Sequence, residues 1–328
     1  MVKYRLIITV MIGMLITTTG LAGVMTVDDI VKGSQQPDSL VYKTVGNVNL
    51  KLIIFNPVGF KPTDHRTAVV FIHGGGWASG FPGLFYPHCR YFASRGAVAV
   101  SVNYRLAAKQ GPTIFDCLAD CRAAVRYIRN NGNRIGIDPD KIAVAGDSAG
   151  GHLAACLGAF MGLETPGEGD PALSMANAVV LYNPAVEMSV FRPDLLNTIF
   201  GITTLPGKEA GRGNTVVTQP EYGRTLEERI RRISPQYYVS SGQPPVLLMH
   251  GTSDKVIPIE QVYRYDEAMK KAGNKCELIA LEGANHAFVL PGYGTEETIV
   301  RAIQAADRFL ASLGYIDGEP TIALSGKK

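Results

Sequence analysis

One serine lies at a turn between two regular elements, in the spacing of an activated nucleophile. Residues 145–151 contain a Gly-x-Ser-x-Gly pattern centred on Ser148. The apolar run 141–144 before it favours a strand, and residues 152–157 after it favour a helix. At such a corner a serine hydroxyl projects above the sheet, beside helix amides that stabilise negative charge. A non-catalytic glycine-rich loop has the same pattern. Whether Ser148 is catalytic therefore depends on the residues that lie near it.

Candidate partners follow two later strands. A serine needs a base to take its proton and an acid to orient that base. Asp254 follows the apolar run 245–250, and His286 follows the apolar run 276–281. Taken singly, Asp254 is also explained as a loop-capping carboxylate and His286 as a surface histidine. Carboxyl ends of parallel strands share one edge of a sheet, and the order Ser, Asp, His is that of a hydrolytic triad. The pattern therefore predicts Ser148 as nucleophile, His286 as base and Asp254 as the residue that orients it.

A glycine-rich turn provides backbone amides for the same chemistry. The continuous apolar run 67–72 favours a buried strand and leads into residues 73–77, which include three consecutive glycines. Acyl transfer places negative charge on a carbonyl oxygen, which fixed amides stabilise. A flexible turn would have the same composition, but its place after a strand and upstream of the serine favours an oxyanion hole. We assign its amides to Gly75, Gly76 and Ala149.

The elements that must position these residues alternate between strand and helix patterns, which predicts an α/β fold. We expect a mostly parallel central sheet with helices on both faces, preceded by an antiparallel hairpin. The expected strands are 40–45, 48–55, 67–72, 97–102, 141–144, 178–182, 245–250 and 276–281, and the expected helices are 84–95, 114–130, 152–161, 221–232, 259–272 and 296–313. The tail from residue 314 onward is predicted to be frayed.

The alternation stops between residues 184 and 235. This stretch is longer than an ordinary connection. We interpret it as an insertion over the active site, which shapes the substrate pockets more than the triad does. Residues 23–328 are then a single catalytic domain with an insertion at about 184–235.

Residues 1–22 have the layout of a signal peptide. Lys3 and Arg5 precede the apolar run 6–16, and small residues end the segment at Ala22. The apolar run is shorter than the roughly 20 residues that a membrane-spanning helix needs. We therefore expect cleavage after Ala22, a secreted or periplasmic protein, and no stable membrane anchor after cleavage.

Composition excludes several other classes. Hydrophobic residues make up 46% of the chain and charged residues 19%, as in an ordinary globular protein. The net charge is +3 without a clustered Lys/Arg stripe, so we expect no nucleic-acid partner. The five cysteines are an odd number without Cys-x-x-Cys spacing, which fits neither a zinc site nor a disulfide framework.

Taken together, the motifs resemble the hormone-sensitive-lipase-like branch of the α/β-hydrolases. Within it, they are similar to secreted bacterial esterases of the acetylxylan or feruloyl esterase type. The resemblance extends from about residue 41 to residue 313 and rests on residues 73–77, 103–106, 138–139, 146–151, 234–235, 250–254 and 285–286. It implies a serine carboxylesterase that needs no metal or cofactor.

The resemblance also implies substrates and supporting residues. Expected substrates are short acyl esters, either small molecules or acetyl and feruloyl groups on plant polysaccharide. Asp147, Tyr104 and Arg105 match positions that brace the site without being catalytic. Relatives usually carry an N-terminal cap, whereas here the lead after the signal is short. Substrate size should therefore depend on the insertion.

Two alternatives use the same fold. A prolyl-oligopeptidase-like peptidase has the same triad but normally carries a large additional domain, for which this chain has no room. A non-catalytic binding protein would have lost its base. The joint presence of Ser148, Asp254 and His286 argues against it.

Overall fold

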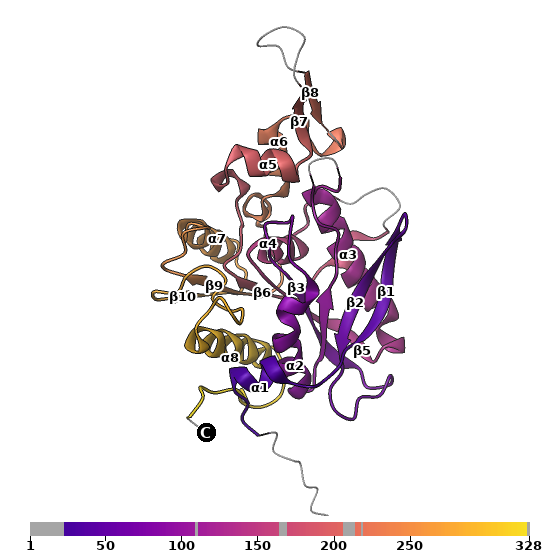
Figure 1. Ribbon diagram of the computed structural model, residues 1–328, viewed down its shortest axis with the longest axis vertical. Coiled ribbons are helices and arrows are strands. Elements are labelled where there is room, and N and C mark those ends of the chain that lie inside the picture. The colour runs from indigo at the N-terminus through magenta and orange to yellow at the C-terminus, as the bar shows by residue number, and fades with distance from the viewer. Residues whose placement is uncertain (1–22, 109–110, 164–168, 206–213, 218, 327–328) are drawn as a thin grey trace, which may run out of the picture.

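The central feature of the molecule is an eight-stranded sheet. The computed structural model describes residues 23–108, 111–163, 169–205, 214–217 and 219–326, so the predicted signal peptide at 1–22 lies outside them. The strand order is β1-β2-β4-β3-β5-β6-β9-β10 (Figure 1). The strands are β1 (Asp38–Val45), β2 (Val48–Phe55), β3 (Arg66–Ile72), β4 (Val98–Val102), β5 (Ile137–Asp147), β6 (Ala178–Tyr182), β9 (Val246–Gly251) and β10 (Cys276–Leu281).

Strand directions follow the prediction. β1 and β2 form an antiparallel hairpin, and β2 is also antiparallel to β4. All other neighbours in the sheet run parallel. Parallel neighbours need a crossover between them, and the helices that follow the strands provide it. The mostly parallel α/β architecture expected from the sequence is confirmed, with the strands at 178–182 and 276–281 at their predicted bounds.

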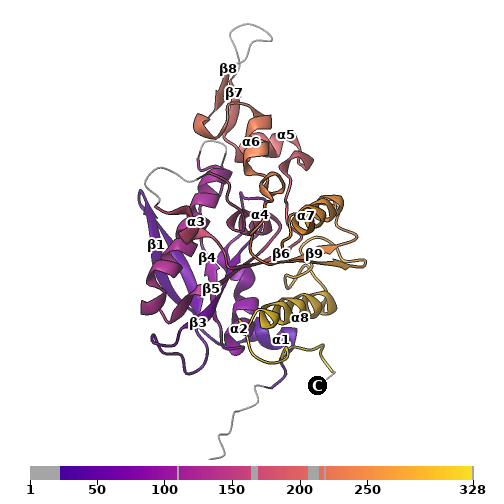
Figure 2. The same cartoon turned by 180° about the vertical axis from the view of Figure 1, so that it is seen from behind.

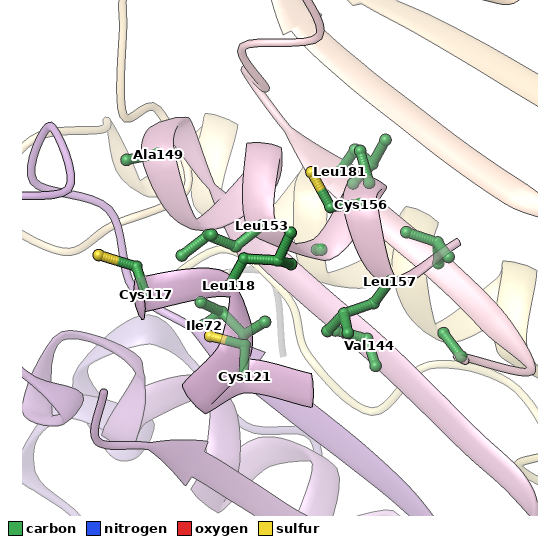
Figure 3. Packing of buried hydrophobic residues seen from close by; sticks show 14 of the residues in the cluster. Ile72, Cys117, Leu118, Cys121, Val144, Ala149, Leu153, Cys156, Leu157 and Leu181 are labelled. Carbon is green, nitrogen blue, oxygen red and sulfur yellow. The ribbon is translucent and has the colours of Figure 1, made fainter. Parts of the chain in front are cut away.

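Helices cover both faces of this sheet. Side chains alternate along β3, so Ala68, Val70 and Ile72 enter one hydrophobic core while Val69 and Phe71 enter the other. Figure 3 shows the first core, where α3 and α4 pack on β3, β5 and β6. One layer contains α3 (Ile114–Asn131), α4 (Ser148–Leu157) and α7 (Glu260–Lys271), and the other contains α1 (Val27–Lys32), α2 (Tyr86–Ser94) and α8 (Glu296–Ser312).

The inserted segment stands on the α3 and α4 layer, at the opposite end of the molecule from α1 and α8 (Figures 1 and 2). It contains α5 (Pro193–Ile199), the antiparallel hairpin β7 (Ile202–Leu205) and β8 (Asn214–Val217), and α6 (Leu226–Ile233). The buried guanidinium of Arg229 on α6 holds it together, because it donates to the carbonyls of Gly223, Phe200 and Gln219. This buried cation therefore connects three backbone positions in the described part of the insertion.

Several predicted elements have other bounds in the structure, among them the strand expected at 141–144, which is the longer β5, and two helices. The helix expected at 221–232 is interrupted, because Gly223 has a φ of 122° and Thr225 then caps the shorter helix α6. The helix expected at 152–161 is α4, which begins at Ser148 and ends at Leu157. Its first turn contains two glycines, which propensity alone would leave outside a helix.

The prediction of a frayed tail is wrong through residue 326. The backbone of Met25 donates to Thr321 and accepts from Ala323, so the tail pairs with the start of the described chain. Ile322 is 1% exposed and packs in the second core. Long-range pairing therefore overrides the general tendency of a chain end to fray. Within the residues that the structure describes, no helix is long and apolar enough to cross a membrane.

Candidate active site

Ser148 lies at the corner between β5 and α4 in a strained conformation. Its φ is 51°, in the left-handed region that side chains with a Cβ rarely adopt. The corner is so tight that a Cβ on Gly146 would lie 2.3 Å from the carbonyl oxygen of Gly150, and a Cβ on Gly150 would lie 2.0 Å from that of Ile72. The two glycines of the motif are therefore required by close backbone approach, and the surrounding structure maintains the strained conformation of Ser148.

The three predicted polar residues meet at the carboxyl edge of the sheet. Ser148 Oγ lies 2.9 Å from His286 Nε2, and His286 Nδ1 lies 2.7 Å from Asp254 Oδ2. Because the carboxylate only accepts, His286 carries its proton on Nδ1 and presents the Nε2 lone pair to Ser148. The Asp254 side chain is fully buried, whereas that of His286 is 20% exposed. This arrangement can take the hydroxyl proton from Ser148.

Asp254 is fixed by donors on every side. Its Oδ1 accepts from the amides of Val256 and Ile257, at 2.8 and 2.9 Å. Buried His250 places Nε2 3.0 Å from the Ile257 carbonyl and 3.3 Å from Asp254 Oδ2. Burial alone would raise the pKa of Asp254, but the hydrogen bonds from His286 and Ile257 outweigh it, so the pKa lies below its usual value. Asp254 therefore stays ionised opposite the imidazole.

The residues proposed for the oxyanion hole have suitable amides. The Gly75 carbonyl accepts from the amides of Ala78 and Ser79 and from the Ser79 hydroxyl. Since the amide in the same peptide plane points the opposite way, the Gly76 N–H is turned out of the loop. Neither Gly75 nor Gly76 donates its amide to another described residue. Ala149 is the second residue of α4, so its amide has no acceptor within the helix.

His73 shapes this loop from inside. Its Nδ1 is 2.8 Å from the Gly74 carbonyl, to which it donates, and this turns the amide of Gly75 in the opposite direction. Burial lowers the pKa of His73 to about 4, which keeps the ring neutral. The Tyr104 hydroxyl donates to the His73 carbonyl at 2.7 Å, and the two rings stack 4.4 Å apart. Tyr104 therefore braces the loop, while Arg105 reaches α3, where it is paired with Asp120.

Asp147 connects the loop to the corner. Its Oδ1 accepts the amide of Gly74 at 2.8 Å. A Cβ on Gly74 would lie 2.6 Å from Asp147 Oδ2, so only glycine fits there. The side chain is buried, and this burial raises the pKa of Asp147 to about 6, although the Gly74 amide opposes the shift. Asp147 thus holds the oxyanion loop against β5 without reaching the Ser148 hydroxyl.

The raised pKa predicts a pH-dependent effect of Asp147→Asn. Folding favours the protonated acid, so wild-type stability falls as pH rises from about 4, the unfolded pKa, to about 6. Asparagine keeps the acceptor for Gly74 and removes the charge. We expect the stability difference between variant and wild type to grow by up to about 3 kcal/mol over this interval, from a shift of about two pKa units. Urea unfolding at pH 4 to 8 measures it. A difference that stays constant over that range would contradict the assignment.

A cavity of about 520 Å³ opens beside Ser148, a size suited to a small molecule. The inserted segment contributes Phe191 and Leu195 to its wall. Aromatic rings lie at its border, since Phe81 is 60% and Tyr293 69% exposed. The insertion predicted at about 184–235 thus borders the cavity and contributes apolar side chains to its wall.

Sequence patterns predicted six candidate site residues and the bracing side chains Asp147 and Tyr104, but not the supports behind them. The structure brings together all six predicted site residues, although not from one contiguous stretch. It adds His250, Trp77 and His152 behind them and Phe191 in the cavity wall. The only signal for His152 was its spacing of four from Ser148, which places both on one face of a helix. No group of three or more potential metal-ligating side chains occurs in the described part of the chain.

Comparison with known families identifies the family of this chain. The model of the BD-FAE family matches residues 54–269 of the 328, which include Ser148 and Asp254. The chain belongs to the BD-FAE family. This BD-FAE protein superimposes on the apo form of Thermogutta terrifontis esterase 2 with a TM-score of 0.73 and 37% identity, covering 86% of this chain and 97% of that one. The α/β-hydrolase fold expected from the motifs is confirmed.

Curated relatives of this BD-FAE protein are longer. It is 29% identical to a probable isoprenylcysteine alpha-carbonyl methylesterase of Oryza sativa subsp. japonica, over 69% of this chain and 52% of that protein. It is also 29% identical to the esterase LipC of Mycobacterium tuberculosis, over 70% of this chain and 55% of that protein. The chain thus spans about half the length of the curated relatives it matches.

Proposed function

We propose that the protein is a serine carboxylesterase acting on short acyl esters. The observation that carries the proposal is the hydrogen-bonded series from Ser148 through His286 to Asp254 at the border of a cavity. The oriented imidazole makes a hydroxyl nucleophilic at neutral pH. The amides of Gly75, Gly76 and Ala149 stabilise the charge that the attack creates.

In this mechanism Ser148 is the nucleophile, and His286 acts first as base and then as acid in each half-reaction. Ser148 Oγ attacks the ester carbonyl carbon while His286 Nε2 takes the hydroxyl proton. The carbonyl π electrons move to the oxygen, which the three amides stabilise. Collapse of this intermediate breaks the bond to the alcohol oxygen, and His286 returns the proton to it. Water, activated by the same imidazole, then attacks the acyl-enzyme and releases the carboxylic acid and free Ser148.

Related structures support short acyl groups. Thermogutta terrifontis esterase 2 has been solved with propionate and with butyrate bound, and phosphorylated by paraoxon, at 38–39% identity to this chain. Here the side chains of Phe191 and Leu195 border the cavity with apolar atoms. Acetyl or feruloyl groups on plant polysaccharide are the finer proposal, which rests on the motif resemblance and on the predicted export of the chain after cleavage at residue 22.

A panel of esters tests the proposal. We expect kcat/KM on p-nitrophenyl esters to be highest for acyl chains of two to four carbons and to fall for longer ones, because the apolar wall from the insertion closes on the acyl chain. Paraoxon should add one diethylphosphoryl group at Ser148, visible by mass spectrometry of the digested protein. Acetate release from acetylated xylan and ferulate release from feruloylated arabinose test the carbohydrate substrates.

The same panel separates the alternatives. An aminoacyl-p-nitroanilide cleaved faster than the acetate ester would indicate the peptidase. Absence of both turnover and labelling would indicate a binding protein. Either result would refute the esterase proposal.

A further inference from the structure

The oxyanion loop ends in a tryptophan that is held in an unusual conformation. Trp77 directly follows Gly75 and Gly76 and has a φ of 63°, while its indole is 1% exposed. A bulky residue in the left-handed region is strained and needs support from its surroundings. Part of this support comes from Ala107, whose amide donates to the Trp77 carbonyl at 2.8 Å. The rest comes from the indole.

The indole is held by a fully buried histidine. Trp77 Nε1 donates to His152 Nδ1 at 3.1 Å. Because Nδ1 accepts, the proton of the neutral ring lies on Nε2, which donates to the carbonyl of Ile233 at 2.8 Å. Burial lowers the pKa of His152 to about 4, so the ring remains neutral at ordinary pH. The two hydrogen bonds therefore fix both the tautomer and the orientation of the imidazole.

The hydrogen bonds of His152 join two different parts of the molecule. Ile233 is the last residue of α6 in the inserted segment, whereas Trp77 belongs to the loop after β3. The insertion reaches the indole a second time, since the ring of Phe191 packs edge-on against it at 5.4 Å. The amide of Met188 donates to Ser234 Oγ, which ties these two contact points of the insertion together.

We propose that His152 is a positioning residue that locks the oxyanion loop to the inserted segment through Trp77. The inference rests on the proposed esterase function, in which the neighbouring glycines stabilise the oxyanion. The insertion then has two roles. It lines the cavity with Phe191, and through the indole it holds in place the loop in which His73 and Ser79 direct the amides of Gly75 and Gly76. Loss of the connection should lower kcat, with KM changed little, because the amides contribute most when the oxyanion forms.

Variants of the two bonded side chains test this proposal. His152→Leu removes both hydrogen bonds, and Trp77→Phe removes the indole N–H while it keeps an aromatic ring. We expect each to lower kcat on p-nitrophenyl acetate by about 10- to 100-fold, less than the loss of one complete oxyanion donor. His152→Gln supplies an acceptor and a donor and should recover part of the loss. The double variant should lose little more than either single variant, because both act through one bond.

A second readout separates positioning from general damage. A thionoester carries sulfur in place of the carbonyl oxygen and fits the oxyanion amides poorly. The ratio of the rate on the oxygen ester to the rate on the thionoester therefore reports how well the amides are aligned. We expect this ratio to fall in His152→Leu and Trp77→Phe. It should be unchanged in His88→Leu, which makes the same replacement at a buried histidine packed against Phe71 and Phe85 in the other core.

Two results would overturn the proposal. One is an unchanged ratio in Trp77→Phe, which decides the question even if His152→Leu fails to fold. The other is a double variant whose losses multiply. Both differ from failure of the proposed function, in which the wild-type protein itself would hydrolyse neither ester.

Discussion

Ser148→Ala is expected to lower kcat on p-nitrophenyl acetate by about 10⁵-fold or more. In the proposed mechanism the hydroxyl oxygen forms the bond to the acyl carbon, and no other described side chain is hydrogen-bonded to His286 Nε2. Removing one oxygen from a half-buried side chain leaves the core intact, so the stability to urea should change little. The measurement is steady-state hydrolysis together with paraoxon labelling, which should disappear in the variant.

Contamination by host esterases is the main source of residual activity in such a variant. Ser241→Ala is a matched control for purification, since it removes a hydroxyl from an exposed loop before β9 and leaves the nucleophile in place. Hydrolysis by Ser148→Ala at more than a few per cent of the wild-type rate, in a sample that paraoxon does not label, would exclude Ser148 as the nucleophile.

Asp254→Asn should have the second-largest effect, a loss of about 10³- to 10⁴-fold in kcat. The amide oxygen of asparagine would replace Oδ1, which accepts from Val256 and Ile257. Its NH₂ group would then face His286 Nδ1 and require a lone pair there. The imidazole proton would move to Nε2 and point at Ser148, so the base could no longer accept the hydroxyl proton.

The pH dependence distinguishes this explanation from simple loss of structure. At alkaline pH, hydroxide can replace the imidazole as the base that takes the Ser148 proton. The activity of Asp254→Asn should therefore continue to rise at pH values where the activity of the wild type no longer changes. Asp28→Asn makes the same chemical change at an exposed carboxylate paired with Lys32 and should behave as wild type. Wild-type activity in Asp254→Asn would show that another group orients His286.

The sequence was informative wherever a local pattern has a direct structural meaning. Ser148 was recognised because a strand, a tight glycine turn and a helix follow one another within a few residues. The order of Asp254 and His286 after buried strands then predicted that they share an edge, because parallel strands all end there. For the same reason Gly75 and Gly76 were identified before any contact was known. When residues are close in sequence, or directly follow a predicted strand, their spacing is enough to predict their relative positions.

The tertiary structure decided the contacts between segments far apart in the chain. The pairing of Met25 with Thr321 orders a tail that its position at the chain end predicts to be frayed. His152 looks like one more residue of an apolar helix until the structure places Trp77 on one ring nitrogen and Ile233 on the other. Hydrogen bonds of this kind depend on where two distant segments meet in the fold. The helix and strand periodicity of a sequence does not predict that position.

The same distinction separates the chemistry of this protein from its selectivity. Sequence motifs predict Ser148, His286 and Asp254 as the catalytic residues. The cavity wall at Phe191 and the support of the oxyanion loop by α6 depend on how the inserted segment packs on the α3 and α4 layer. Packing energies are summed over many weak contacts among similar apolar residues, so they fix the shape of the cavity only once the whole chain has folded.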